Sequence, residues 1–223
     1  MMDCIRRALW GGLVLALAVP AWGVKTATWT QQNPKDFSEG TFEQTVVSSH
    51  GELMLGRAVT VLHKTKEQAE VVNALARGPD GAVYAATGGT GHIYRVAGDE
   101  VTTFAKLPDK NVFSLLFAKD GTLLAGTGGE RGRIFRISAD GTFAPFFEPA
   151  ETAYVWAMVR GSQGEIYAAT GTEGKLFRID PTGKESDVLY DAKQKSLLCL
   201  AADRHGLLYA GTDTDGLVLR IDP

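Results

Sequence analysis

The sequence predicts an all-β fold, a β-propeller built from four-stranded antiparallel blades. A Gly-rich phrase recurs four times in the 223-residue chain, first as ATGGTGHIYRV at residues 86–96 and last as GTDTDGLVLRI at residues 211–221. A turn glycine precedes each copy, and consecutive turn glycines are 40, 43 and 42 residues apart. Units of this length that divide into short strands are typical of propeller blades.

The four units share several repeat positions, which are counted here from the turn glycine. The turn glycines are Gly81, Gly121, Gly164 and Gly206. A large apolar residue follows three positions later, at Tyr84, Leu124, Tyr167 and Tyr209. A threonine follows after six positions, at Thr87, Thr127, Thr170 and Thr212. A second glycine (Gly91, Gly132, Gly174, Gly216) is followed four residues later by an arginine, at Arg95, Arg136, Arg178 and Arg220.

The third unit shows the predicted strands most clearly. Residues 154–160 (YVWAMVR) form a continuous apolar and β-rich run, which predicts a strand buried on both faces. Three further strands are expected at residues 165–170, 175–180 and 186–191, each bounded by Gly-rich or Pro-containing turns. Helical periodicity is weak throughout, and the short run at residues 65–72 is interpreted as a connection.

The repeated phrase carries a family resemblance. The pattern DG-x-x-Y-A-x-T-G-x-x-G-x-I-Y-R resembles the blades of secreted bacterial β-propellers of the WD-repeat-like, YVTN-like superfamily. The resemblance covers residues 71–223 and extends to residues 42–63. It implies the fold, but it implies no single function, because scaffolds, receptors, sensors and enzymes share this architecture.

The predicted propeller occupies residues 41–223. Residues 41–64 are expected to form a degenerate blade with two strands, 42–49 and 52–63, around the turn at His50 and Gly51. Blades are expected at 71–110, 111–153 and 154–195, and an incomplete blade at 196–223. Either residues 58–63 complete the last blade and close a small ring, or the chain is a fragment and further blades are missing; the pattern favours the fragment.

The N-terminus has the layout of a secretory signal peptide at residues 1–23. Arg6 and Arg7 precede an apolar run at residues 8–18, and Ala21-Trp22-Gly23 forms a small-residue cleavage site. The expected product is exported to the periplasm or the extracellular space and has no membrane span after cleavage. The alternative is an uncleaved anchor. Residues 24–40 are expected to be irregular.

Composition narrows the function classes. The formal net charge is −3 and no basic stripe is present, so the sequence does not favour a nucleic-acid partner. Only Cys199 follows the leader, and its repeat position predicts a small packing residue rather than a nucleophile. No cofactor or metal site is predicted, and no catalytic residues are assigned, because no His pair, Gly-x-Ser-x-Gly motif or recurring carboxylate pair occurs.

The conserved parts of the repeat are interpreted as architecture. A phosphate-binding loop needs a helix behind it, whereas a strand follows each Gly-rich loop here, so the glycines are predicted to form hairpin turns. The four arginines are expected to pair with a carboxylate or a carbonyl within or between blades. The alternative is a ring of cations that binds an anion.

Divergent repeat positions supply the candidate binding residues. Eight residues before the turn glycine stand Asn73, Phe113 and Trp156, and two residues earlier in the second and third units stand Asn111 and Tyr154. These five residues are expected at the rim of the central channel, facing an unknown protein or small molecule on the face that carries the Gly-rich loops. The alternative is that the aromatic rings fill the gap between blades. The sequence thus predicts a binding or sensory module, with a hydrolase or lyase at the channel, or a structural spacer, as alternatives.

Overall fold

The computed structural model describes residues 30, 45–48, 50, 52–56, 59–64 and 70–223. The described residues are all-β apart from one short 3-10 helix, and the predicted fold class is confirmed: the chain forms part of a β-propeller. The predicted leader at residues 1–23 and all but Thr30 of segment 24–40 lie outside the described residues.

The chain divides into two units after Val59. In the first unit, β1 (Thr45–Val47) pairs antiparallel with β2 (Leu53–Leu55), with Val46 opposite Met54. The two strands flank the predicted turn. Residues 42–44, 49 and 57–58 of the expected strands lie outside the described residues, and Ser48 and Gly56 are described but belong to no strand. Residues 59–63 form no strand, so in the described residues they do not complete another sheet.

The second unit contains four antiparallel sheets. The first consists of β3 (Val71–Arg77), β4 (Val83–Gly88), β5 (His92–Ala97) and β6 (Glu100–Lys106). The second consists of β7 (Asn111–Phe117), β8 (Leu123–Gly128), β9 (Ile134–Ile137) and β10 (Phe143–Phe147). The third consists of β11 (Tyr154–Arg160), β12 (Ile166–Gly171), β13 (Lys175–Ile179) and β14 (Ser186–Asp191). The fourth has β15 (Leu197–Ala202), β16 (Leu208–Thr212) and β17 (Val218–Ile221), with the 3-10 helix η1 (Thr214–Gly216) before β17.

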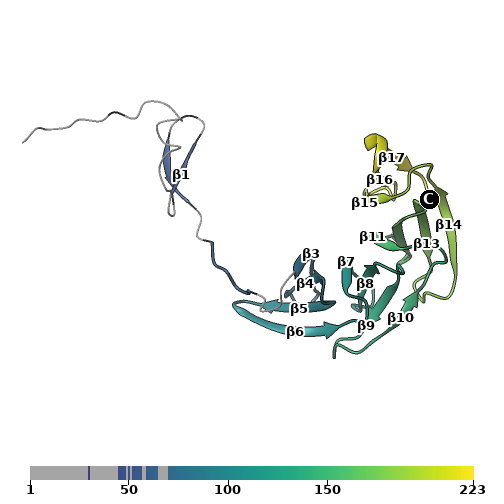
Figure 1. Ribbon diagram of the computed structural model, residues 1–223, viewed down its shortest axis with the longest axis horizontal. Helices are drawn as coiled ribbons and strands as arrows, with labels where there is room; N and C mark the ends of the chain where they lie inside the picture. Colours follow the sequence, from purple (N-terminus) through teal and green to yellow (C-terminus); the bar gives the residue numbers. More distant parts are fainter. Residues whose placement is uncertain (1–29, 31–44, 49, 51, 57–58, 65–69) are drawn as a thin grey trace, which may run out of the picture. The chain divides into compact units, whose positions relative to one another are not determined.

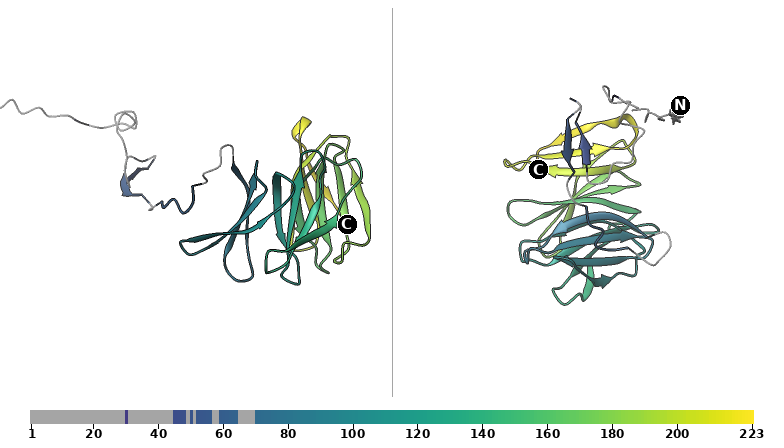
Figure 2. Two further views of the ribbon diagram at one scale, coloured as in Figure 1. Left: turned by 60° about the horizontal axis from the view of Figure 1, so that its bottom comes forward. Right: turned by 90° about the vertical axis from the view of Figure 1, so that its left-hand side faces the viewer.

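Within this unit the sheets follow one another along an arc, with β3, β7, β11 and β15 on its inner side (Figure 1). Single backbone bridges connect neighbouring sheets: Tyr154 pairs with Gly128, and Ser196 pairs with Gly171. Figure 2 shows the same sheets from two further sides. All four strands predicted in the third unit are present, within one residue at each end.

Each sheet has two ends, which define two faces of the unit. The loop face carries the Gly-rich loops at residues 87–91, 126–132, 170–174 and 212–216. The turn face carries the tight turns at the turn glycines. All four turn glycines have positive φ, between 81° and 102°, as predicted for tight hairpins. Gly132 differs from the other second glycines because its φ is not positive; it is instead packed against the backbone of Tyr154.

Buried apolar clusters hold consecutive sheets together. Nine residues before the turn glycine, Val112, Val155 and Leu197 are fully buried against the preceding sheet, whereas Val72 in the first sheet is 62% exposed. Two residues after the second glycine, Ile93, Ile134 and Leu176 are fully buried against the next sheet, whereas Val218 in the fourth sheet is 77% exposed. The same repeat positions are therefore core residues wherever a neighbouring sheet covers them.

The prediction for Cys199 is wrong. Its Sγ lies beside Gly211, so the side chain packs locally on its own sheet, but the residue is exposed. The equivalent Ser114 is buried because the neighbouring third sheet covers it, and its Oγ donates a hydrogen bond to the Val155 carbonyl (3.2 Å). No described sheet covers Cys199 in this way.

Three of the repeated arginines have the structural partners that the repeat predicts. Arg95 binds Asp80 in its own sheet (2.7 Å). Arg136 donates to the carbonyl of Pro181 in the next sheet (2.6 Å) and lies over the ring of Phe146. The third contact is looser, with Arg178 Nε 3.6 Å from Asp187. Separately, the part of the chain that the structure describes contains no helix with the length and hydropathy that a membrane span requires.

Candidate functional site

The three predicted aromatic residues form one cluster on the loop face. Phe113 comes from β7, and Tyr154 and Trp156 come from β11. The rings of Tyr154 and Trp156 are stacked, with centroids 4.6 Å apart and planes 12° apart. Phe113 lies 4.7 Å from Trp156 and 5.7 Å from Tyr154, with tilted and edge-on geometry. All three residues are half-buried, so the cluster packs between sheets and still presents ring surface to solvent.

Two glycines at the ends of second strands make room for these rings. A Cβ at Gly128 would lie 2.6 Å from the ring of Tyr154 and 3.0 Å from that of Phe113. A Cβ at Gly171 would lie 2.7 Å from Trp156 Nε1 and 2.5 Å from Ser196 Oγ. Both positions follow the turn glycine by seven residues. The glycine at this repeat position therefore leaves a stretch of backbone without a Cβ, against which the aromatic rings pack.

The indole nitrogen of Trp156 is buried and has no hydrogen-bond partner among the described residues. An unsatisfied buried N–H costs about 1–3 kcal/mol relative to a paired one. A ligand or a rearrangement that gives this N–H an acceptor would therefore be stabilised by the recovered hydrogen bond.

The two predicted asparagines hold sheets together. The side-chain amide of Asn73 donates to the carbonyl of Val112 (3.1 Å), and Asn111 Oδ1 accepts a hydrogen bond from the Gly89 backbone N–H (2.9 Å). Asn111 also lines a hollow of about 330 Å³ beside Asp109, Lys110 and Arg131. The structure thus brings Asn111 next to the aromatic cluster, while Asn73 contributes to the boundary between the first two sheets.

An ion pair supports the loop-face hollow. Asp109 accepts hydrogen bonds from Arg133 Nε (3.0 Å) and Arg133 Nη2, and Thr127 Oγ1 donates to the same carboxylate (2.6 Å). The hydrogen bonds to Asp109 raise the pKa of Arg133 above its ordinary value. These bonds fix the loop that precedes Asn111 against the second sheet.

Glu70, which comes just before β3, forms a polar cluster with Thr90, His92 and Tyr94 of the first sheet. The carboxylate of Glu70 accepts hydrogen bonds from Thr90 Oγ1 (2.5 Å) and from the Tyr94 hydroxyl (3.3 Å). His92 Nδ1 lies 3.1 Å from Thr90 Oγ1 and 3.4 Å from Glu70. A nucleophile–base–acid relay needs hydroxyl and carboxylate on opposite ring nitrogens. Here both lie on the same nitrogen, so this group does not have the geometry of such a relay.

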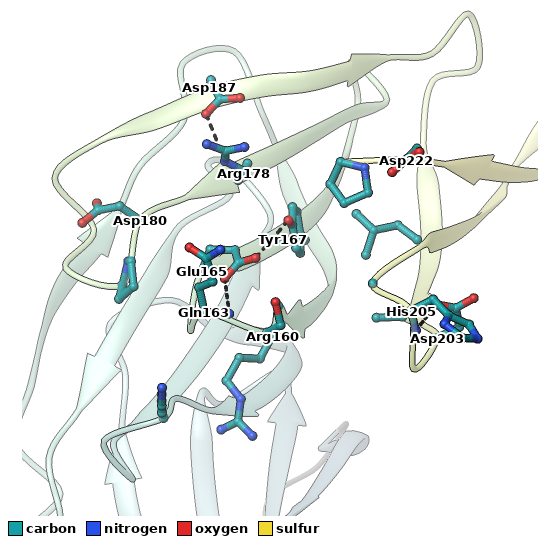
Figure 3. A pocket seen from close by; sticks show the side chains of 18 of the residues that line it. Arg160, Gln163, Glu165, Tyr167, Arg178, Asp180, Asp187, Asp203, His205 and Asp222 are labelled. Atoms are coloured by element: carbon teal, nitrogen blue, oxygen red, sulfur yellow. Dashed lines mark hydrogen bonds and ion pairs between the residues drawn. The ribbon is translucent and has the colours of Figure 1, made fainter.

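A further hollow lies on the turn face, which sequence reasoning did not single out. It has a volume of about 960 Å³ and lies between the third and fourth sheets. Figure 3 shows Glu165, Tyr167 and Arg178 on one wall and Asp203, His205 and Asp222 on the other. At the corresponding repeat positions, Gln163 and Ala202 stand where the first interface has Asp80 and Phe117.

Polar contacts in this hollow are mainly local. Glu165 accepts hydrogen bonds from the Gln163 backbone N–H (2.9 Å) and from the Tyr167 hydroxyl (3.2 Å). Burial, with the nearby carboxylate of Glu165, raises the pKa of Tyr167 above its ordinary value. His205 Nε2 accepts a hydrogen bond from Arg204 Nε (3.1 Å). Among the described residues, no three His, Cys, Asp or Glu side chains come together as a metal site would require.

Comparisons with known proteins show the fold. No family model and no curated protein sequence matches the chain. Virginiamycin B lyase from Staphylococcus aureus superposes with a TM-score of 0.60 at 14% identity, covering 80% of this chain and 62% of the lyase. A calcium-binding protein, regucalcin, from Agrobacterium tumefaciens superposes with a TM-score of 0.58 at 22% identity, covering 77% of this chain and 66% of regucalcin.

A structure of a nidogen/laminin complex matches with a TM-score of 0.55 at 9% identity, covering 63% of this chain and 55% of that chain. This chain has the β-propeller fold. It spans less than two thirds of the length of each of these structures. Because a lyase, a calcium-binding protein and a nidogen/laminin complex share the fold with this chain at such low identity, the function must be argued from the site.

Proposed function

We propose that this chain is an exported β-propeller of the YVTN-like group that binds a small molecule or a protein on its loop face and catalyses no reaction. The observation that carries the proposal is the cluster of Phe113, Tyr154 and Trp156, which two neighbouring inner strands place at one edge of the unit. Half-buried aromatic rings combine apolar area with few rotatable bonds, so they form binding surfaces at low entropic cost.

Two further features support binding at this place. The unpaired indole N–H of Trp156 gives the cluster a hydrogen-bond donor that a bound acceptor would satisfy. The hollow beside Asn111 adds polar groups at the margin of the rings. A ring-bearing ligand with an acceptor group, such as a sugar, a nucleoside or an aromatic side chain of a peptide, fits this combination.

The absence of catalysis is part of the proposal. Two histidines with polar neighbours, His92 and His205, do not stand as free bases: His92 meets both oxygen partners through one nitrogen, and the Nε2 of His205 accepts from Arg204. The alternative, a hydrolase or lyase, would draw on the carboxylates around His205.

Ligand-observed NMR on the purified full chain tests both parts at once. The mixture contains cellobiose, adenosine and the tripeptide Gly-Phe-Gly, and the indole N–H signal of Trp156 is followed in parallel. We expect saturation transfer to at least one member, a shift of that indole signal, and loss of both in Trp156→Ala. The matched control is Phe143→Ala, which removes an exposed ring on β10 and should bind as the wild type does.

Export is tested by the mass of the chain recovered after expression with residues 1–23, where cleavage before Val24 is expected.

In the NMR experiment, transfer that persists in Trp156→Ala would overturn the proposed site. Conversion of any member of the mixture into a new compound would overturn the non-catalytic proposal and favour the hydrolase or lyase.

A further inference from the structure

The gaps between consecutive sheets on the turn face are built from the same repeat positions. Between the first and second sheets the gap is filled by three rings. Tyr84 meets Phe104 and Phe117 edge-on, at centroid distances of 4.9 and 5.1 Å. A hollow of only about 340 Å³ remains beside them.

Two of these three rings are missing between the third and fourth sheets. Tyr167 corresponds to Tyr84. Ala202 stands four residues before its turn glycine, where the second sheet has Phe117. Leu189 stands at the bulge of β14, where β6 has Phe104. The resulting cleft of about 960 Å³ is bounded by Tyr167 on one wall and by Ala202 and Leu208 on the other.

The charges of the cleft also differ from those of the filled gap. In the first sheet, Asp80 binds Arg95 through Nε and Nη2 (2.9 and 2.7 Å) and accepts from the Tyr84 hydroxyl (3.3 Å). In the third sheet Gln163 replaces that aspartate, so Arg178 turns to Asp187 and Tyr167 donates to Glu165 instead (Figure 3). The contacts among Asp80, Arg95 and Tyr84 therefore have no counterpart in the third sheet, where the equivalent Arg178 and Tyr167 line the cleft.

Carboxylates outnumber cations around the cleft. Four cationic side chains line it, and three of them are hydrogen-bonded or ion-paired: Arg160 to the Phe117 carbonyl, Arg178 to Asp187, and Arg204 to His205. Six carboxylates line it, from Glu165, Asp180, Glu185, Asp187, Asp203 and Asp222. The six carboxylates exceed the four Lys and Arg side chains by two, which favours a cation.

We propose that this cleft is a second binding site, for a small organic cation built on a ring. The ring takes the space that Phe117 occupies in the first gap, beside Ala202. An amine or amidine group then faces carboxylates on both walls, from Glu165 on one and from Asp203 and Asp222 on the other. The site is separate from the loop-face cluster, and the inference does not rest on the function proposed for that cluster.

Benzamidine and benzoate, which share a ring and differ in charge, are the probes. In titrations of the full chain followed by NMR, we expect benzamidine to bind with a dissociation constant on the order of 1 mM, as for other fragments of this size. Benzoate should bind about tenfold more weakly, because the charge excess repels it. Equal binding of the two, or no binding of benzamidine up to about 20 mM, would overturn the proposal.

The Ala202→Phe variant places the missing ring in the cleft and should weaken benzamidine binding by at least about tenfold. The matched control is Ala201→Phe, the same change one residue earlier on the opposite face of β15, which should retain the wild-type affinity. Asp222→Asn, at an exposed position, tests the charge without adding volume and should weaken binding about threefold. Trp156→Ala should have no effect. Unchanged affinity in both Ala202→Phe and Asp222→Asn would contradict the site.

Discussion

The gap between the first and second sheets and the gap between the third and fourth sheets are built on the same repeat, yet one is filled and the other is open. Both have a buried apolar seam near the inner strands, with Val112 in one and Leu197 in the other fully buried. They differ at the turn face, where Phe104 and Phe117 give way to Leu189 and Ala202. The comparison shows that the shared repeat positions fix the packing of the sheets, while positions that vary between the units decide whether the gap at the turn face is filled.

The largest expected effect tests the shared seam. Leu176→Ala removes a fully buried side chain between the third and fourth sheets and should lower the free energy of unfolding by about 2–5 kcal/mol. Val218→Ala changes the same repeat position where it is 77% exposed and should change the free energy of unfolding by less than about 0.5 kcal/mol. Urea unfolding of both variants measures the difference. Similar losses would mean that the face of Val218 is covered in solution.

The next effect concerns the filled gap. Phe117→Ala removes a half-buried ring that contacts Tyr84, and we expect a loss of about 2 kcal/mol, below the range for fully buried phenylalanine. Urea unfolding measures this loss. A neutral result would show that the first gap is not held together by its rings, and the comparison with the open gap would fail.

A smaller effect follows from the Arg95–Asp80 pair of the filled gap. The hydrogen bond from Arg95 lowers the pKa of Asp80 below 3.8. Because the folded pKa is depressed, the stabilisation is present above the unfolded pKa and is lost as the pH falls through the folded value. NMR titration of the Asp80 carboxyl should therefore show a depressed pKa that returns toward 3.8 in Arg95→Met. No upward movement in that variant would contradict the pairing.

The smallest effect is local to the turn beside the open cleft. Hydrogen bonds from the Thr182 hydroxyl and from the Glu185 backbone N–H lower the pKa of Asp180 from 3.8 to about 2. The carboxylate thus keeps its charge well below pH 4. Thr182→Val should raise the pKa of Asp180, as measured by NMR titration, and Thr142→Val in the equivalent Asp140 turn is the matched comparison. An unchanged pKa in Thr182→Val would rule out the hydroxyl as the main cause.

The fold could be predicted from the sequence because the repeat is local: turn glycines, β-rich runs and spacing appear within each unit. The aromatic cluster could also be located, since Phe113, Tyr154 and Trp156 diverge at neighbouring repeat positions. Its packing on Gly128 and Gly171 could not, because it depends on contacts between units.

Two features depend on which sheet covers which face. Cys199 was expected to be packed because its equivalents are small, but exposure depends on a neighbouring sheet that a repeat position does not specify. The open cleft was missed for a related reason. Ala202 is an ordinary strand residue until Phe117 is seen to fill the equivalent gap in another interface.

The most direct test of the comparison is the free energy of unfolding of Ala202→Phe, measured by urea denaturation beside the wild type. An open cleft accommodates the added ring, so we predict an unchanged value or a gain of up to about 1 kcal/mol. A gap that is already filled would be overpacked by the ring, and a loss of about 1–3 kcal/mol would contradict the account.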